Sequence, residues 1–180
     1  MSDERTTITG TLGDEELTGT SGNDLIKSGN GVDVVYGGDG NDWINAFLND
    51  YGEIRFYLTI GTLTAWGEGG NDLINGKSGS DTIYGGEGND SLRGQDSDDI
   101  LDGGTGDDFL SGGIGDDTFI ASMGDDTILS GLGFDILELG QDYTILGGEI
   151  DLASGDLFLE FSGMAGEVAF ITVWDHAFTP

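Results

Sequence analysis

The chain has 180 residues, 35 acidic against five basic, and a formal net charge of −30. So strong a negative charge disfavours binding to nucleic acid or to anionic membranes, and it opposes compaction unless cations are bound. There is no cysteine, so disulfides and thiol chemistry are excluded, and no apolar run is long enough to span a bilayer.

The N-terminal end precedes the first periodic segment. Residues 1–9 predict a short strand or a frayed end, with Ile8 as its one candidate core residue. The segment MSDERTTITG lacks the apolar region of a secretory signal peptide.

A first array of nine-residue units occupies residues 10–45. The units are GTLGDEELT, GTSGNDLIK, SGNGVDVVY and GGDGNDWIN. Their sixth positions are Glu15, Asp24, Asp33 and Asp42, and their eighth positions are Leu17, Ile26, Val35 and Ile44. The first unit is degenerate, as terminal units of a solenoid usually are.

The period is interrupted at residues 46–66. Apolar residues alternate with Arg55, Tyr57 and Thr59, and Gly61 then leads into TLTAW, a pattern that predicts a β-hairpin. One interpretation is a lateral excursion that packs on the solenoid and leaves both arrays continuous. The other is an arm that pairs with another chain or recognises a ligand.

A second array of eight units fills residues 67–138 without remainder. The sixth position is Asp in every unit, namely Asp72, Asp81, Asp90, Asp99, Asp108, Asp117, Asp126 and Asp135. The eighth position is always apolar, and glycine dominates the first and fourth positions. We expect the first glycine to permit a backbone with positive φ, and the three residues after the Asp to form a short strand with one buried side chain. Such units must stack to share a core.

Residues 139–180 lack the Asp column. Alternation in 156–161 and the apolar run 168–174 predict strands that cap the open end of the core. The last residues, WDHAFTP, lie where a type I secretion signal would lie.

The units resemble the G-G-x-G-x-D-x-U-x nonapeptide of RTX proteins, the hemolysin-type calcium-binding repeat. The resemblance implies an all-β, right-handed parallel β-roll, a β-solenoid with a C-terminal β cap and about six turns, in which units two apart share calcium ions. It also implies that the ligands are main-chain carbonyls and the sixth-position carboxylates of Asp24, Asp33, Asp42, Asp72, Asp81, Asp90, Asp99, Asp108, Asp117, Asp126 and Asp135.

Catalytic groups are scarce. The lone histidine, His176, lies near the end of the chain, and neither G-x-S-x-G nor H-E-x-x-H occurs. The regular spacing of the carboxylates explains them as ligands, which leaves a glycosidase pair as a minor alternative. We therefore expect no enzyme.

The resemblance also implies export by a type I system and folding on extracellular calcium, because extracellular modules bind calcium at roughly 10⁻⁴ to 10⁻³ M. Since the chain begins with Met and shows no catalytic domain, the sequence favours a non-enzymatic surface or matrix protein that self-associates or binds a matrix partner. The alternative is a secretion and folding module of a larger secreted enzyme, adhesin or toxin.

Overall fold

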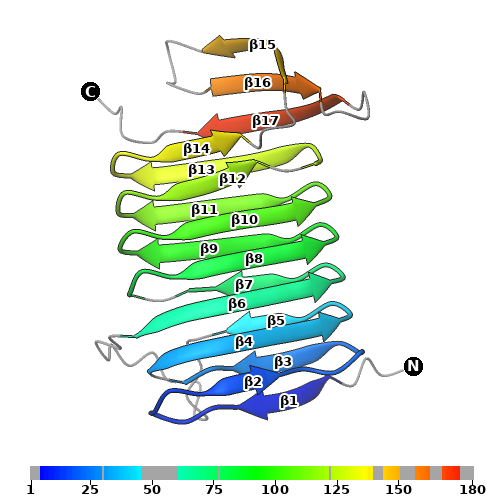
Figure 1. Ribbon diagram of the computed structural model, residues 1–180, viewed down its shortest axis with the longest axis vertical. Helices are drawn as coiled ribbons and strands as arrows, with labels where there is room; N and C mark the ends of the chain where they lie inside the picture. Colours follow the sequence, from blue (N-terminus) through cyan, green and yellow to red (C-terminus); the bar gives the residue numbers. More distant parts are fainter. Residues whose placement is uncertain are drawn as a thin grey trace.

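The computed structural model describes residues 5–29, 31–45, 61–76, 78–121, 123–139, 144–150, 157–162 and 168–174. Within these ranges the chain forms strands only, and they belong to two sheets that face each other along a tall solenoid (Figure 1). None of the described segments is a helix of the length and apolarity needed to span a membrane.

The odd-numbered repeat strands and the three C-terminal strands, β15 (Thr144–Ile150), β16 (Leu157–Ser162) and β17 (Val168–Trp174), form a ten-stranded sheet in the order β1-β3-β5-β7-β9-β11-β13-β17-β16-β15. Its repeat strands are β1 (Thr6–Thr9), β3 (Asp24–Lys27), β5 (Trp43–Asn45), β7 (Leu73–Asn75), β9 (Ser91–Asp96), β11 (Phe109–Ile114) and β13 (Asp126–Leu132). The even-numbered repeat strands form a seven-stranded parallel sheet, consisting of β2 (Glu16–Thr18), β4 (Val32–Asp39), β6 (Thr62–Gly69), β8 (Thr82–Glu87), β10 (Ile100–Thr105), β12 (Thr118–Ala121) and β14 (Ile136–Leu139).

Neighbouring strands in each sheet come from units two apart. Leu92 of β9 pairs with Leu110 of β11, and Leu101 of β10 pairs with Ile83 of β8, which is a spacing of eighteen residues in both sheets. Two nonapeptides therefore make one turn, and the predicted parallel β-solenoid is confirmed.

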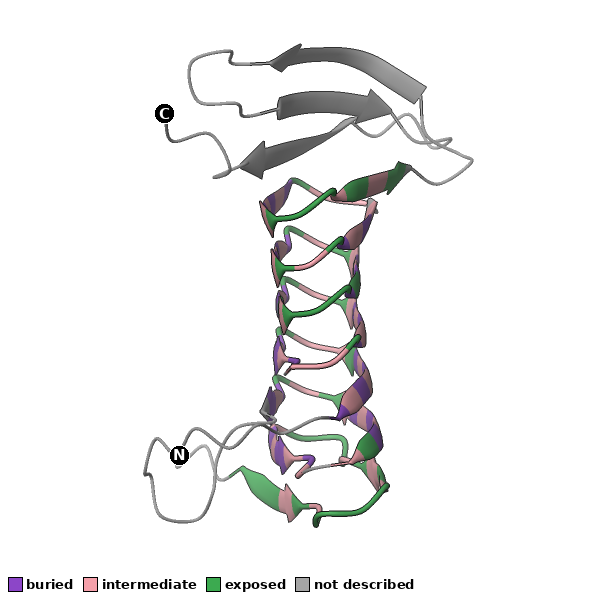
Figure 2. Ribbon diagram, turned by 90° about the vertical axis from the view of Figure 1, so that its left-hand side faces the viewer, coloured by how far each residue is buried: buried purple, intermediate pink, exposed green. Residues whose placement is uncertain are grey.

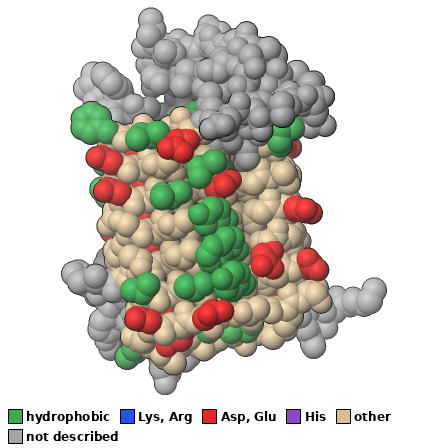
Figure 3. Space-filling view, viewed as in Figure 1, with side chains coloured by type: hydrophobic (Ala, Val, Ile, Leu, Met, Phe, Trp, Pro, Cys, Tyr) green, Lys and Arg blue, Asp and Glu red, His purple; other side chains and the backbone are tan. Residues whose placement is uncertain are grey.

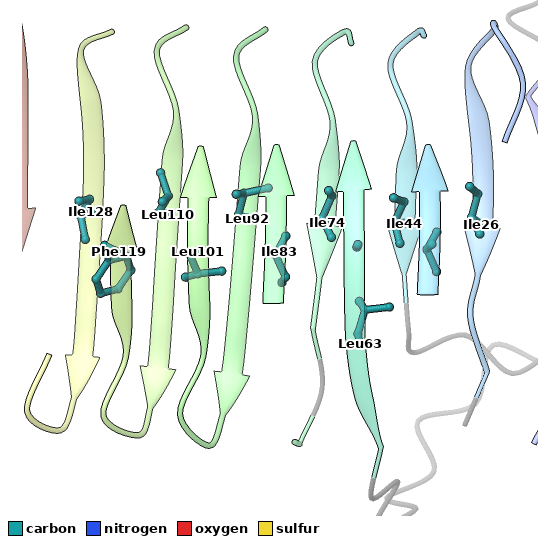
Figure 4. Close-up of a cluster of buried hydrophobic side chains, with 12 residues drawn as sticks. Ile26, Ile44, Leu63, Ile74, Ile83, Leu92, Leu101, Leu110, Phe119 and Ile128 are labelled. Carbon is teal, nitrogen blue, oxygen red and sulfur yellow. The ribbon is translucent and has the colours of Figure 1, made fainter. Parts of the chain in front are cut away.

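The core is a single file of side chains between the two sheets (Figure 4). Its fully buried members are the eighth-position residues Ile26, Val35, Ile44, Ile74, Ile83, Leu92, Leu101, Leu110, Phe119 and Ile128, joined by Leu63 and Ala65. Ile8, Leu17 and Leu137 pack against the two ends of this file and are partly buried. Burial alternates along the strands (Figure 2), so the predicted out, in, out pattern after each Asp is confirmed.

The strands are longer than the predicted three residues. β8, β9, β10 and β11 each have six, because the ladder continues through the first three positions of the next unit. The expected positive φ at the first glycine is also wrong. Positive φ falls at the second and fourth positions, as at Gly86 and Gly88, and even Gln95 and Ser97 adopt it there.

Residues 62–66 correct the predicted hairpin. They belong to β6, which pairs in parallel with β4 and β8, so they are part of the solenoid. Ala65 occupies the eighth position, opposite Val35 and Ile83. The spacing from β4 to β6 and from β5 to β7 is thirty residues, so both sheets run on across the interruption, as the lateral-excursion interpretation requires. The other predicted hairpin strand, 54–60, lies outside the described residues.

Two C-terminal strands are present as predicted, β16 at Leu157–Ser162 and β17 at Val168–Trp174. A third, β15 at Thr144–Ile150, was not predicted. β17 adds to the first sheet in parallel with β13, and β16 and β15 follow in antiparallel pairing. The pairing thus becomes antiparallel one strand beyond β13, which carries the last Asp of this sheet.

Candidate metal sites

The sixth-position carboxylates form two rows, one along each edge of the solenoid. The first row precedes or begins the odd-numbered strands and consists of Asp24, Asp42, Asp72, Asp90, Asp108 and Asp126. The second row precedes the even-numbered strands, except that Asp33 lies within the start of β4, and it consists of Glu15, Asp33, Asp81, Asp99, Asp117 and Asp135. All are buried except Glu15 and Asp135 at the ends of the second row. The structure therefore brings all eleven predicted ligands into the two rows.

One oxygen of each central carboxylate has a structural role. Asp90 Oδ1 accepts a hydrogen bond of 2.8 Å from the amide N–H of Asp72, one turn earlier, and Asp99 Oδ1 accepts one of 2.8 Å from Asp81. The same bond recurs along both rows. It satisfies a buried backbone donor that would otherwise destabilise the tight corner.

The second oxygen is the one available to a ligand. Among the described residues, Oδ2 is buried without a hydrogen-bond partner in Asp42, Asp72, Asp90, Asp99, Asp108 and Asp117. Burying a carboxylate oxygen without a donor or a cation is costly, and native proteins rarely tolerate it. Six such atoms at one structural position indicate a ligand for each row.

First-position glycines leave room beside these oxygens. A Cβ built on Gly85 would lie 2.3 Å from Asp90 Oδ2 and 2.4 Å from the carbonyl oxygen of Gly103, one turn later. The same pair of atoms, a carboxylate oxygen and a carbonyl oxygen, surrounds Gly67 and Gly76. The glycine thus lets a carboxylate oxygen and a carbonyl oxygen from two turns approach each other, and calcium accepts both kinds of ligand in flexible geometry.

Carboxylates alone do not make these sites. Among the described residues, no group of three or more His, Asp or Glu side chains converges on one point. A cation held beside Asp90 Oδ2 would therefore take most of its ligands from main-chain carbonyls such as that of Gly103.

Burial weakens the acidity of the central carboxylates. Loss of hydration raises the pKa of Asp42, Asp90 and Asp117 to about 6, that of Asp72 and Asp108 to about 7, and that of Asp99 to about 8. The hydrogen bond from the preceding turn opposes each rise. Without a cation these groups therefore hold their protons to higher pH than an exposed aspartate does.

In calcium-free buffer, lowering the pH from about 8 to about 5 is expected to stabilise the folded form. Unfolded Asp titrates near 3.9, whereas the six central carboxyls titrate at about 6 to 8 when folded, so the folded chain binds more protons between these values. This stabilisation is lost as pH rises through the folded pKa values. Far-UV circular dichroism of calcium-depleted protein should show a β signal at pH 5 that is weaker at pH 8. At saturating calcium the trend should reverse, because protons then compete with the cation; the same trend in both buffers would contradict the prediction.

A second ladder, at the fifth position, was not predicted. Asn41 Oδ1 accepts from the amide N–H of Asn71 at 2.9 Å, and Asn71 Oδ1 accepts from that of Asn89 at 2.9 Å. On the other edge Asp98 Oδ1 accepts from Asp116 at 2.9 Å. The recurring Asn-Asp and Asp-Asp dipeptides are the sequence feature that could have predicted this ladder. These exposed side chains link successive turns in the direction opposite to the sixth-position bonds.

Comparison with known families agrees with this geometry. The family described as RTX calcium-binding nonapeptide repeat (4 copies) matches residues 9–44, 66–101, 75–110 and 102–137. These ranges coincide with the two rows and with the parallel strands that carry them. A search of curated proteins gives no match.

Proposed function

The chain belongs to the RTX calcium-binding nonapeptide repeat family, and on that premise we propose that it is a secreted protein whose β-roll folds on extracellular calcium. The observation that carries this proposal is the set of six buried Oδ2 atoms without a partner. Bound calcium supplies the positively charged partner that these buried carboxylates need. Together with a net charge of −30, they make the folded state unfavourable in a calcium-free compartment.

Export in the unfolded state follows from the same competition between carboxylate repulsion and calcium binding. Where calcium is scarce, repulsion among the rows keeps the chain extended, and where it reaches about millimolar, weak extracellular-type sites fill. We propose type I secretion, with the signal in the C-terminal residues. The absence of cysteine is compatible with such a route, because no disulfide has to form during export.

For its role outside the cell we propose a non-enzymatic surface or matrix protein that self-associates. The outer edges of β1 and β2 support this role, since within the described residues no other strand pairs with them. Parallel strands with unpaired edges are templates for pairing with another chain. The alternative, a folding module of a larger secreted enzyme, adhesin or toxin, uses the same calcium chemistry and differs only in what is attached to the roll.

Removing calcium is expected to unfold the chain. In excess EGTA at pH 7.5 far-UV circular dichroism should report disorder, and the β signal should return cooperatively as free calcium rises to about 1 mM. Magnesium at the same concentration is the control, because its smaller octahedral shell suits flexible carbonyl sites poorly. A compact, fully folded species in EGTA would contradict the proposal.

A further inference from the structure

The second row of carboxylates is interrupted at one place. Leu63 occupies the sixth position there, opposite Asp33 on the preceding turn, and the next member of the row is Asp81. Leu63 is only 2% exposed, so its side chain fills the place that a carboxylate fills elsewhere. The first row has no such break: Asp42 N–H donates to Asp72 Oδ1 at 2.6 Å across the same thirty-residue interval.

The interruption reduces the number of carboxylate oxygens between three successive turns. Leu63 N–H still donates to Asp81 Oδ1 at 2.7 Å, so the link to the following turn is retained. Leu63 itself has no side-chain oxygen for the preceding turn. The spaces on either side of it, toward Asp33 and toward Asp81, therefore contain one sixth-position carboxylate where the rest of the row has two.

Three aromatic rings bridge the same three turns on the outer face of the seven-stranded sheet. Tyr36 of β4 stacks on Trp66 of β6 with centroids 4.9 Å apart and planes 12° apart. Trp66 stacks on Tyr84 of β8 at 5.4 Å and 10°. Each ring stands three residues after Asp33, Leu63 or Asp81, and the ladder aligns them directly. Figure 3 shows hydrophobic side chains forming a column along this face.

The stack is confined to the turns around the break. At the same ninth position, the other strands of this sheet carry Thr18, Asp102, Ile120 and Glu138. β4 and β6 are also the longest strands of the solenoid, with eight residues each. Aromatic stacking and a longer ladder thus coincide with the missing carboxylate.

We propose that Leu63 breaks the calcium row on this edge, and that the stacked rings of Tyr36, Trp66 and Tyr84 hold the three turns together across the break without an ion. The proposal rests on the calcium-driven folding proposed above. It assigns the chain an unbroken row of ion sites on one edge and two separate groups of sites on the other.

The first test compares calcium titrations of the full chain followed by far-UV circular dichroism. Trp66→Leu, which removes the central ring, is expected to raise the midpoint at least about threefold. Trp66→Phe, which keeps a ring, should stay close to the wild type. Phe109→Leu is the matched control, because Phe109 is an equally half-buried outward ring between turns with complete carboxylate pairs. Equal midpoints for Trp66→Leu and Phe109→Leu would overturn the proposal.

The second test transplants the arrangement. Asp99→Leu makes a new break without rings and should raise the midpoint more than about tenfold. Adding Asp102→Trp and Ile120→Tyr extends the stack from Tyr84 across that break, since these positions are aligned with Tyr84. If the two added rings reverse at least half of the increase in the logarithm of the calcium midpoint, the proposal is supported. If they reverse none of it, the proposal is overturned. If the wild-type β signal does not depend on calcium, the proposed calcium-driven folding is wrong. This outcome is distinct from a failure of the proposal about Leu63 and the rings.

Discussion

Replacing Gly94 by alanine is expected to raise the calcium concentration needed for folding by about tenfold or more. Gly94 occupies a first position and is fully buried at the corner before Asp99. A Cβ there would lie 2.1 Å from Asp99 Oδ2 and 2.7 Å from its Cγ, so the carboxylate must move. Overpacking of this kind costs about 1 to 3 kcal/mol, and here it also displaces the oxygen that faces the cation. The β signal should therefore fail to appear at calcium concentrations that fold the wild type.

Gly69→Ala is the matched control for this substitution. Gly69 lies in the same solenoid, at a third position, and the nearest atom to a Cβ built there is Asp39 Oδ1 at 3.6 Å. Its backbone is not in the left-handed region either. We expect a calcium midpoint close to that of the wild type. Similar losses in the two variants would show that the site geometry does not explain the first-position glycine.

The repeats were predictable because each of their features is local. The nine-residue period fixes the buried column and the two carboxylate rows, since units two apart must stack to bury residues such as Leu92 and Leu110. The role of the first glycine was not predictable in the same way. Sequence reasoning assigned it positive φ, whereas at Gly85 and Gly94 the constraint is space beside a carboxylate, which only the packed turn reveals.

The turn containing Leu63 could not be identified from its own residues. Thr62 to Trp66 have neither the Asp nor the paired glycines of a unit, and their alternation is equally typical of a hairpin. Their place is set by pairing with β4 and β8, at a spacing of thirty residues on one side. The stacking of Trp66 on Tyr36 and Tyr84 depends on that register, so no local sequence pattern predicts it.

Among the carboxylates, central members should matter more than terminal ones. Asp99 contacts both neighbouring turns: its Oδ1 accepts from Asp81, and its N–H donates to Asp117 Oδ1 at 2.9 Å. Asp99→Asn keeps an oxygen acceptor but replaces the other carboxylate oxygen by an amide, removing the charge that faces the cation. Because ligand charge sets calcium affinity, we expect the folding midpoint to rise at least about tenfold. Asp99→Ala should cost about 1 to 3 kcal/mol more, because it also leaves the buried Asp81 N–H without its acceptor.

The terminal positions supply the comparison. Asp135 lies at the end of the second row and is half-buried, and among the described residues it accepts only from Asp117, at 3.0 Å. Glu15 folds back on its own loop, where its carboxylate accepts from the N–H of Thr11 at 2.9 Å, and hydrogen bonds to Thr11 hold its pKa below the usual value. Calcium titrations should therefore rank the midpoints Asp99→Asn, then Asp135→Asn, then Glu15→Gln, with the last close to the wild type. Equal shifts in all three would mean that each repeat binds its ion alone, because only sharing between stacked turns makes the position in the row matter.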